Sequence, residues 1–250
     1  MDTIQQRFST VGDFVYFMLR YFKEVVRPPY EWRELLIQCF KAGYKSLPLV
    51  AVTAFIMGLV LTLQSRPSLV TFGAESLLPG MVAVSVIREI GPVITALICA
   101  GKIASRIGAE LGSMKVTEQI DAMEVSAINP YKYLVVTRVL ATTCMVPILV
   151  FFADAISLFA SYIAMNIHAD ITLTRYLSAA LSSIDFIDII PACIKSVFFG
   201  FAIGIIGSYK GFTASQGTAS VGSAANNAVI SSSLAIFIID MVAVQITDLI

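Results

Sequence analysis

The chain has 250 residues, of which 57% are hydrophobic and only 14% are charged, and its mean hydropathy is +0.83. A soluble domain carries about 25% charged residues, so this composition predicts an integral membrane protein. The formal net charge is zero, which excludes the basic field of a nucleic-acid-binding protein.

Few residues of the kinds that metal sites and nucleophilic catalysis require are present. His168 is the only histidine, and the four cysteines stand singly without a Cys-x-x-Cys pair. With a single histidine, we expect neither a His-based metal site nor a Ser-His triad within one chain. The G-x-x-x-x-G-K-[ST] phosphate loop is also absent from the sequence. We expect no catalytic residue, no metal and no cofactor bound by this chain.

The first 46 residues predict helices that lie at the membrane surface. Their apolar residues recur at helical spacing, and these are Val11, Phe14, Val15, Met18, Leu19, Phe22, Val25 and Val26. Such a stripe, with charges elsewhere on the wheel, is typical of an amphipathic interfacial helix; a small soluble cap packed on itself is the alternative. Pro28 and Pro29 end this helix, and a second apolar stripe that includes Trp32 leads into the membrane.

Five apolar segments follow that are long enough to cross about 30 Å of hydrocarbon. They lie at about residues 47–64, 80–104, 134–166, 189–209 and 227–247. Lysine and arginine gather before the first segment and between the second and third, which predicts that these regions are cytoplasmic. An odd number of spans then places the N-terminus in the cytoplasm and the C-terminus on the opposite side.

Arg88 and Glu89 form a charge pair inside the second predicted span. An ionised side chain in a span is costly unless it is paired or faces water. Neighbouring helix positions point about 100° apart, so at least one of the two should face a cavity or another helix. Gly91 and Pro92 follow and loosen the backbone where a substrate could approach.

An internal salt bridge that holds helices together is the alternative explanation of this pair. Of the further charges inside predicted spans, Asp154, Lys195 and Asp240 could be its partners. The spacing along the chain does not assign them.

A polar stretch at residues 109–124 separates the second and third spans and predicts a short surface helix. Thr117 could cap this helix, whose first turn is acidic. Its mixed charges and an exposed set of Met114, Ile120 and Met123 suit docking into a groove on a soluble partner. A solvated helix that contacts nothing would show the same pattern.

Small residues recur three or four positions apart in two segments. They are Gly101, Ala104, Ser105, Gly108, Ala109 and Gly112 in one, and Gly200, Gly204, Gly207 and Gly211 in the other. Such stripes let helices approach closely, either across a dimer interface or within one chain.

Several of these stretches together resemble the MlaE, or YrbE, permeases. They are Arg-Glu-Ile-Gly-Pro-Val at 88–93, the run from Ala109 to Met123, Asn-Pro at 129–130 and Val-Gly-Ser-Ala-Ala at 221–225. The amphipathic start followed by five spans also agrees with that family. The resemblance implies an all-α integral membrane protein with one permease domain over residues 1–250. Interfacial and elbow helices would occupy residues 1–46 and the five-span region residues 47–250.

The function that this resemblance implies is transport. The chain would be a homodimeric permease subunit of an ABC transporter in the bacterial inner membrane, with its C-terminus in the periplasm. That transporter would move phospholipids between the inner and outer membranes and so help to maintain outer-membrane lipid asymmetry. A cytoplasmic ABC ATPase dimer would use ATP and Mg, with a STAS-domain accessory protein beside it and a periplasmic MCE-domain hexamer above.

The same resemblance implies roles for particular residues. Arg88 and Glu89 would face a lipid cavity at the centre of the dimer, whereas Asp154, Lys195 and Asp240 receive no role. The polar stretch would be a cytoplasmic coupling helix between spans two and three. Its contacts with the ATPase would come from Glu110, Lys115, Glu118, Gln119 and Asp121.

Two other function classes follow from the residues alone. An ion- or proton-coupled secondary transporter would relay charge through Arg88, Glu89 and Asp240 without an ATPase. Inverted repeats are its usual signature, and the sequence shows no convincing internal symmetry. A membrane scaffold would explain the surface helix but would leave the intramembrane charges without purpose.

Overall fold

In the computed structural model the described residues form helices joined by short turns, with no strand among them, which confirms the predicted all-α class. The structure describes residues 2–28, 30–167 and 171–247, with side chains from residue 11 onward; His168 lies outside these ranges. The helices are α1 (Asp2–Val25), α2 (Trp32–Ala42), α3 (Leu47–Thr71), α4 (Leu78–Ser85), α5 (Gly91–Cys99), α6 (Ser105–Val116), α7 (Gln119–Val125), α8 (Thr137–Asn166), α9 (Leu173–Leu181), α10 (Phe186–Phe212) and α11 (Thr218–Thr247).

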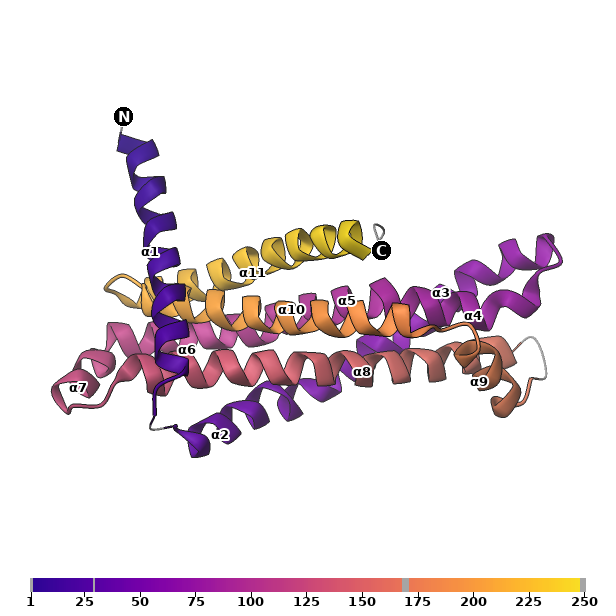
Figure 1. The fold of residues 1–250 in the computed structure, drawn as a ribbon, viewed down its shortest axis with the longest axis horizontal. Helices are drawn as coiled ribbons and strands as arrows, with labels where there is room; N and C mark the ends of the chain where they lie inside the picture. The colour runs from indigo at the N-terminus through magenta and orange to yellow at the C-terminus, as the bar shows by residue number, and fades with distance from the viewer. Residues whose placement is uncertain (1, 29, 168–170, 248–250) are drawn as a thin grey trace.

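Five helical stretches of the described chain are long and apolar enough to cross a membrane, as predicted. They are Trp32–Thr71, Glu75–Val116, Tyr131–Asn166, Phe186–Phe212 and Thr218–Thr247. Each extends beyond its predicted range at one end or both, because polar flanking residues continue the helix past the apolar core. The stretches form an elongated bundle in which α8 and α10 run lengthwise beside each other (Figure 1).

The second span is not a uniform α-helix. π-helical turns at Val86–Ile90 and Ala100–Ala104 flank α5 on its two sides. The Gly91 amide donates to the carbonyl of Val86, five residues back. Pro92 has no amide hydrogen, so it cannot make the usual bond to the carbonyl four residues earlier. The backbone is therefore irregular at the point where Gly91 and Pro92 predicted it.

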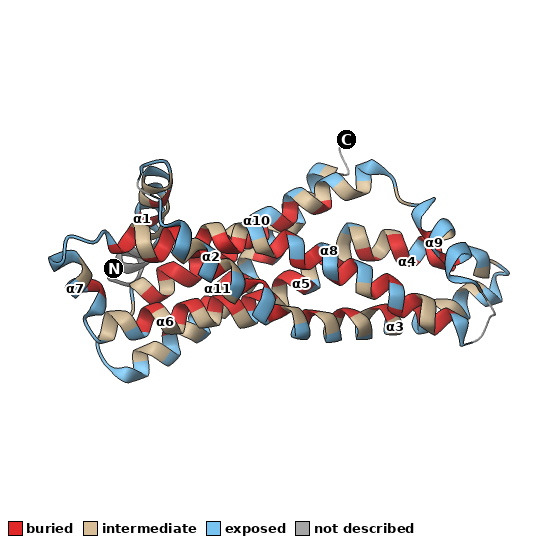
Figure 2. Cartoon of the chain, turned by 90° about the horizontal axis from the view of Figure 1, so that it is seen from below, coloured by how far each residue is buried: buried red, intermediate tan, exposed pale blue. Residues whose placement is uncertain are grey.

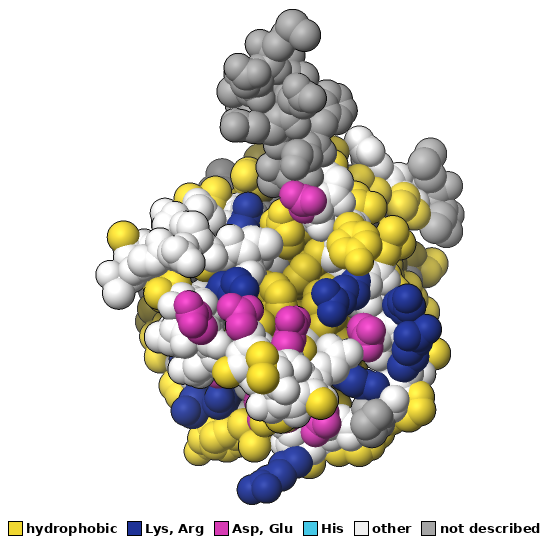
Figure 3. Space-filling model, turned by 90° about the vertical axis from the view of Figure 1, so that its left-hand side faces the viewer, with side chains coloured by type: hydrophobic (Ala, Val, Ile, Leu, Met, Phe, Trp, Pro, Cys, Tyr) yellow, Lys and Arg dark blue, Asp and Glu magenta, His cyan; other side chains and the backbone are white. Residues whose placement is uncertain are grey.

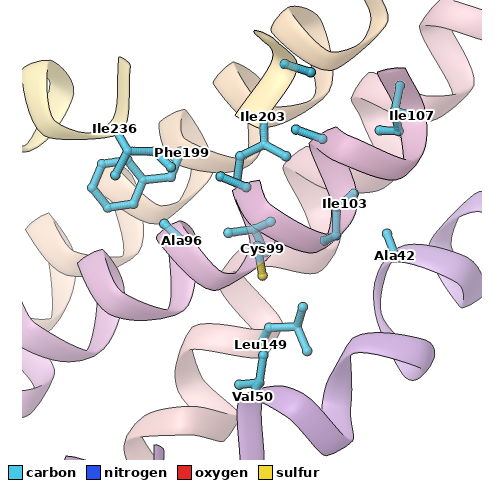
Figure 4. Packing of buried hydrophobic residues seen from close by; sticks show 14 of the residues in the cluster. Ala42, Val50, Ala96, Cys99, Ile103, Ile107, Leu149, Phe199, Ile203 and Ile236 are labelled. Atoms are coloured by element: carbon cyan, nitrogen blue, oxygen red, sulfur yellow. The ribbon is translucent and has the colours of Figure 1, made fainter. Parts of the chain in front are cut away.

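Helix α10 lies at the centre of the bundle and packs against α6, α8 and α11. Its residues Phe199 and Ile203 are fully buried in a hydrophobic core that also contains Cys99 of α5 and Leu149 of α8 (Figure 4). Figure 2 shows buried residues along the facing sides of the helices and exposed residues at both ends of the bundle.

The glycine stripe of α10 serves close packing within one chain. A Cβ placed on Gly200 would lie 2.5 Å from the Thr142 carbonyl oxygen, and one on Gly204 would lie 2.8 Å from the Val139 Cα. These glycines therefore set the distance between α10 and α8. Gly101, in the other predicted stripe, has no atom within 4 Å of such a Cβ.

Helix α1 crosses one end of the bundle at a steep angle to the spans (Figure 1). Phe17 and Tyr21 are buried against the bundle, and Phe17 contacts the rings of Tyr131 and Tyr209. Burial raises the pKa of Tyr21 to about 12. The helix packs on the bundle, which argues against a cap that packs on itself.

Candidate functional site

Three intramembrane charges from three spans meet in one cluster. Lys195 of α10 is only 4% exposed. Its Nζ donates to Glu89 Oε2 at 2.7 Å and to Asp240 Oδ1 of α11 at 3.0 Å. A buried ammonium needs such partners, because burying an unpaired charge is costly. The structure therefore brings together Glu89, Lys195 and Asp240 of the residues that the sequence singled out.

Arg88 points to a different partner from its neighbour. Its Nη1 lies 3.9 Å from Asp188 Oδ1, and 44% of its side chain is exposed. Arg88 and Glu89 thus diverge, as adjacent helical positions predict. The sequence analysis missed Asp188. It is the N3 residue of a capping box with Asp185 at the start of α10, so the Asp-x-x-Asp spacing was the available signal.

A cavity of about 240 Å³ opens beside these charges. Arg88, Glu89 and Lys195 line it together with apolar residues that include Pro191 and Val244. The cavity lies between spans two, four and five, and it combines charged groups with apolar walls. This division matches a ligand that is itself charged at one end and apolar at the other.

Asp154 of α8 lies apart from the cluster. Its side chain is 5% exposed, and its Oδ1 has no hydrogen-bond partner among the described residues. The carboxylate packs against Gly91, where an added Cβ would lie 1.9 Å from Oδ1. The structure therefore does not bear out Asp154 as a partner of Arg88 and Glu89, since the rotation of α8 turns it toward the backbone of span two instead.

The polar stretch at residues 109–124 forms parts of two helices rather than one. Helix α6 ends at Val116, and Glu118, with φ +57°, turns the chain into α7. Thr117 lies after α6, and its hydroxyl donates to the Ser113 carbonyl at 2.8 Å. The prediction that Thr117 caps the start of the surface helix is therefore wrong, because the left-handed residue at 118 separates it from α7.

The surface of α7 is more polar than predicted. Ile120 is 1% exposed and belongs to the main core, so its predicted exposure is wrong. Glu118, Gln119 and Asp121 are exposed. Lys115 Nζ lies 2.8 Å from Asp121 Oδ1, an exposed ion pair between α6 and α7. Figure 3 shows acidic and basic side chains gathered on this end of the bundle.

Glu110 has a different environment from the other four predicted docking residues. Its Oε1 lies 2.9 Å from Arg138 Nη2 of α8 and 3.5 Å from Lys41 Nζ of α2. Arg138 is only 2% exposed. Glu110 thus links α6 to the first and third spans, whereas Lys115, Glu118, Gln119 and Asp121 lie near or on α7.

Comparison with known proteins identifies the family. The family model described as Permease MlaE matches residues 35–246. A probable ABC transporter permease protein of Rickettsia typhi is 37% identical over 230 residues, covering 92% of this chain and 89% of that protein. A probable ABC transporter permease protein of Synechocystis sp. is 36% identical over 82% of this chain and 78% of its own length. The chloroplastic protein TRIGALACTOSYLDIACYLGLYCEROL 1 of Arabidopsis thaliana is 31% identical over 87% of this chain and 62% of its own. The chain therefore belongs to the MlaE family of ABC transporter permeases and is a multi-pass membrane protein.

Proposed function

We propose that this chain is the permease subunit of an ABC transporter that moves phospholipids between the inner and outer membranes and so helps to maintain outer-membrane lipid asymmetry. The observation that carries the proposal is the cavity beside Glu89, Lys195 and Asp240, which joins charges to apolar walls inside the spans. A phospholipid has the same two parts. Membership of an ABC permease family favours transport driven by ATP over an ion-coupled carrier.

Each group of residues that lines the cavity has a role in the proposed lipid binding. Arg88 is half-exposed, and its guanidinium offers two parallel N–H donors to a lipid phosphate. Glu89 is 40% exposed and accepts from buried Lys195, which holds its carboxylate at the cavity for a hydrated or ammonium headgroup. The apolar lining holds the start of the acyl chains.

A second identical copy would complete the cavity. The volume of about 240 Å³ in one chain is below the roughly 300–1,000 Å³ typical of ligand sites. Helix α11 contributes to the cavity and is the least covered of the five candidate spans. Its exposed apolar residues include Leu234, Phe237 and Met241. A homodimer that joins through this helix would cover them and enlarge the cavity.

An ABC transporter permease works with an ATPase partner, and α7 is the proposed contact. The charged end of the bundle would face the cytoplasm with the N-terminus, and the C-terminus would face the periplasm. Two ATPase subunits, using ATP and Mg, would push the two copies of α7 together and collapse the cavity. A STAS-domain accessory protein and a periplasmic MCE-domain hexamer complete the proposed assembly in the bacterial inner membrane.

The test is lipid transfer between reconstituted vesicles by a variant with Arg88→Ala and Glu89→Ala. Losing even one charge-assisted hydrogen bond to the headgroup should slow transfer about tenfold. Mass spectrometry should also find less co-purified phospholipid, while the ATPase still co-purifies. The matched control is Arg66→Ala with Glu75→Ala, which removes an ion pair of 2.8 Å outside the cavity. Normal transfer by the Arg88 and Glu89 variant would reject this site.

A further inference from the structure

A second cavity lies where the end of α1 meets the loop before the third span. Its volume is about 470 Å³, within the roughly 300–1,000 Å³ of known ligand sites. Charged residues of both signs line it: Glu24, Arg27, Glu31 and Lys132. We call this cavity the polar chamber. Its lining suits a ligand that carries both a negative and a positive group.

An apolar groove of about 120 Å³ adjoins the polar chamber. Glu31 and Lys132 line both cavities, so the two lie side by side. The rest of the groove is mainly apolar and aromatic, with Trp32, Leu35 and Leu140 among its lining residues. A ligand that fills both cavities must therefore have a charged head and an apolar chain.

Two side-chain contacts hold the polar chamber in shape. Lys132 Nζ donates to the carbonyl of Arg27. Asn129 Nδ2 donates to Glu24 Oε2 at 3.2 Å. Both contacts link the region around the start of the third span to the end of α1, and a site ordered before binding loses less entropy when a ligand binds.

The position of the two cavities fits the depth of lipid headgroups. Helix α1 runs across the spans and exposes the apolar side chains Val11, Val15 and Leu19 at helical spacing. A helix with this stripe lies in the membrane surface. Tyr30 and Trp32 follow it and are exposed, as aromatic residues are at the boundary between headgroups and acyl chains.

We propose that the polar chamber and the apolar groove bind one zwitterionic phospholipid of the adjacent leaflet. Lys132 and Arg27 would take its phosphate, Glu24 and Glu31 its ammonium, and the groove the first methylenes of one acyl chain. This site is separate from the cavity at Lys195, and the proposal does not depend on what that cavity transports.

Trp32 makes the proposal directly testable, because it is the only tryptophan in the chain. The full-length chain in detergent is titrated with phosphatidylethanolamine brominated on its acyl chains, and Trp32 fluorescence is recorded. We expect saturable quenching at about one lipid per chain. Phosphatidylglycerol with the same brominated chains lacks the ammonium and should bind about tenfold more weakly, the effect of about one lost charge-assisted contact.

Two variants and one control complete the experiment. Lys132→Gln and Glu31→Gln should each weaken phosphatidylethanolamine binding about tenfold, and Glu31 lies in the exposed link before α2, where its change leaves the fold intact. Arg33→Gln removes a charge beside Trp32 from a residue outside the lining of either cavity and should leave binding unchanged. Quenching that does not saturate, equal binding of phosphatidylglycerol, or equal weakening by Arg33→Gln would overturn the proposal.

Discussion

At the residue scale, the tightest constraint in span two is the contact between Gly91 and Asp154. A Cβ at Gly91 would lie 1.9 Å from Asp154 Oδ1 and 2.7 Å from the Val86 carbonyl oxygen. Gly91→Ala must therefore move the Asp154 side chain and shift the π-helical turn. Overpacking of this kind costs about 1–3 kcal/mol, so the variant should unfold at a lower temperature in detergent.

Gly101→Ala is the matched control for this variant. It adds the same methyl group to the same span, but no atom lies within 4 Å of the new Cβ. Since alanine favours a helix over glycine by up to about 1 kcal/mol, its unfolding temperature should stay level or rise. Equal unfolding temperatures for the two variants would show that Gly91 is not confined as the structure has it.

The sequence predicts the features of the charged site that depend on a residue's own segment of the chain, and not those that depend on how the helices pack. Arg88 and Glu89 stand out because charges inside apolar spans are rare. Their partners could not be assigned, since pairing depends on how α10 and α11 rotate against span two. Asp154 illustrates this limit: it occupies a span as Lys195 does, yet its helix turns it away from the cluster.

At the element scale, Glu110 braces α6 against α8 and α2. Glu110→Gln would leave Arg138, which is 2% exposed, without its carboxylate partner. Breaking a fully buried pair costs about 3–5 kcal/mol; Glu110 is 31% exposed, so we expect a smaller but clear loss. Thermal unfolding of the purified chain measures it.

Glu118→Gln is the control, because it removes the same charge from the exposed N-terminal end of α7. A surface change of this kind alters stability by about 0.5 kcal/mol or less. If the Glu110 and Glu118 variants unfold at the same temperature, the bracing role of Glu110 is contradicted. The docking role predicted from the sequence would then regain support.

The number of spans was predictable because apolar length is a local property of the sequence. The helix ends were not, since residues such as Trp32 and Lys115 continue helices that hydropathy alone would end. The break between α6 and α7 results from the left-handed backbone of Glu118. This conformation is uncommon for residues other than glycine, so it could not be predicted from the residue type. The burial of Ile120 follows from how α7 folds back on the bundle.

At the scale of the whole molecule, span two connects two distant regions. Arg88 and Glu89 lie on its first π-helical turn, and α7 follows its far end through α6. Glu110 anchors that end to two other spans. A push on α7 would therefore reach the cavity through one helical stretch whose two π-helical turns, at Val86–Ile90 and Ala100–Ala104, are the places where it can bend.

If α7 is the contact for the ATPase, changing its exposed charges should affect ATPase binding but not the stability of the chain. Glu118→Lys with Asp121→Lys reverses two exposed charges on and beside α7, and the second change also sets Lys115 against a like charge. The ATPase should no longer co-purify with the permease, whereas the unfolding temperature of the chain should change little, because exposed pairs contribute about 0–1 kcal/mol.

The control for charge alone is Glu75→Lys, the same single reversal as Glu118→Lys but at the opposite end of the bundle (Figure 1). It should leave ATPase co-purification intact. Retained binding by the α7 double variant would place the ATPase contact elsewhere on the charged end. Loss of binding with Glu75→Lys as well would show that the assembly responds to net charge and not to α7.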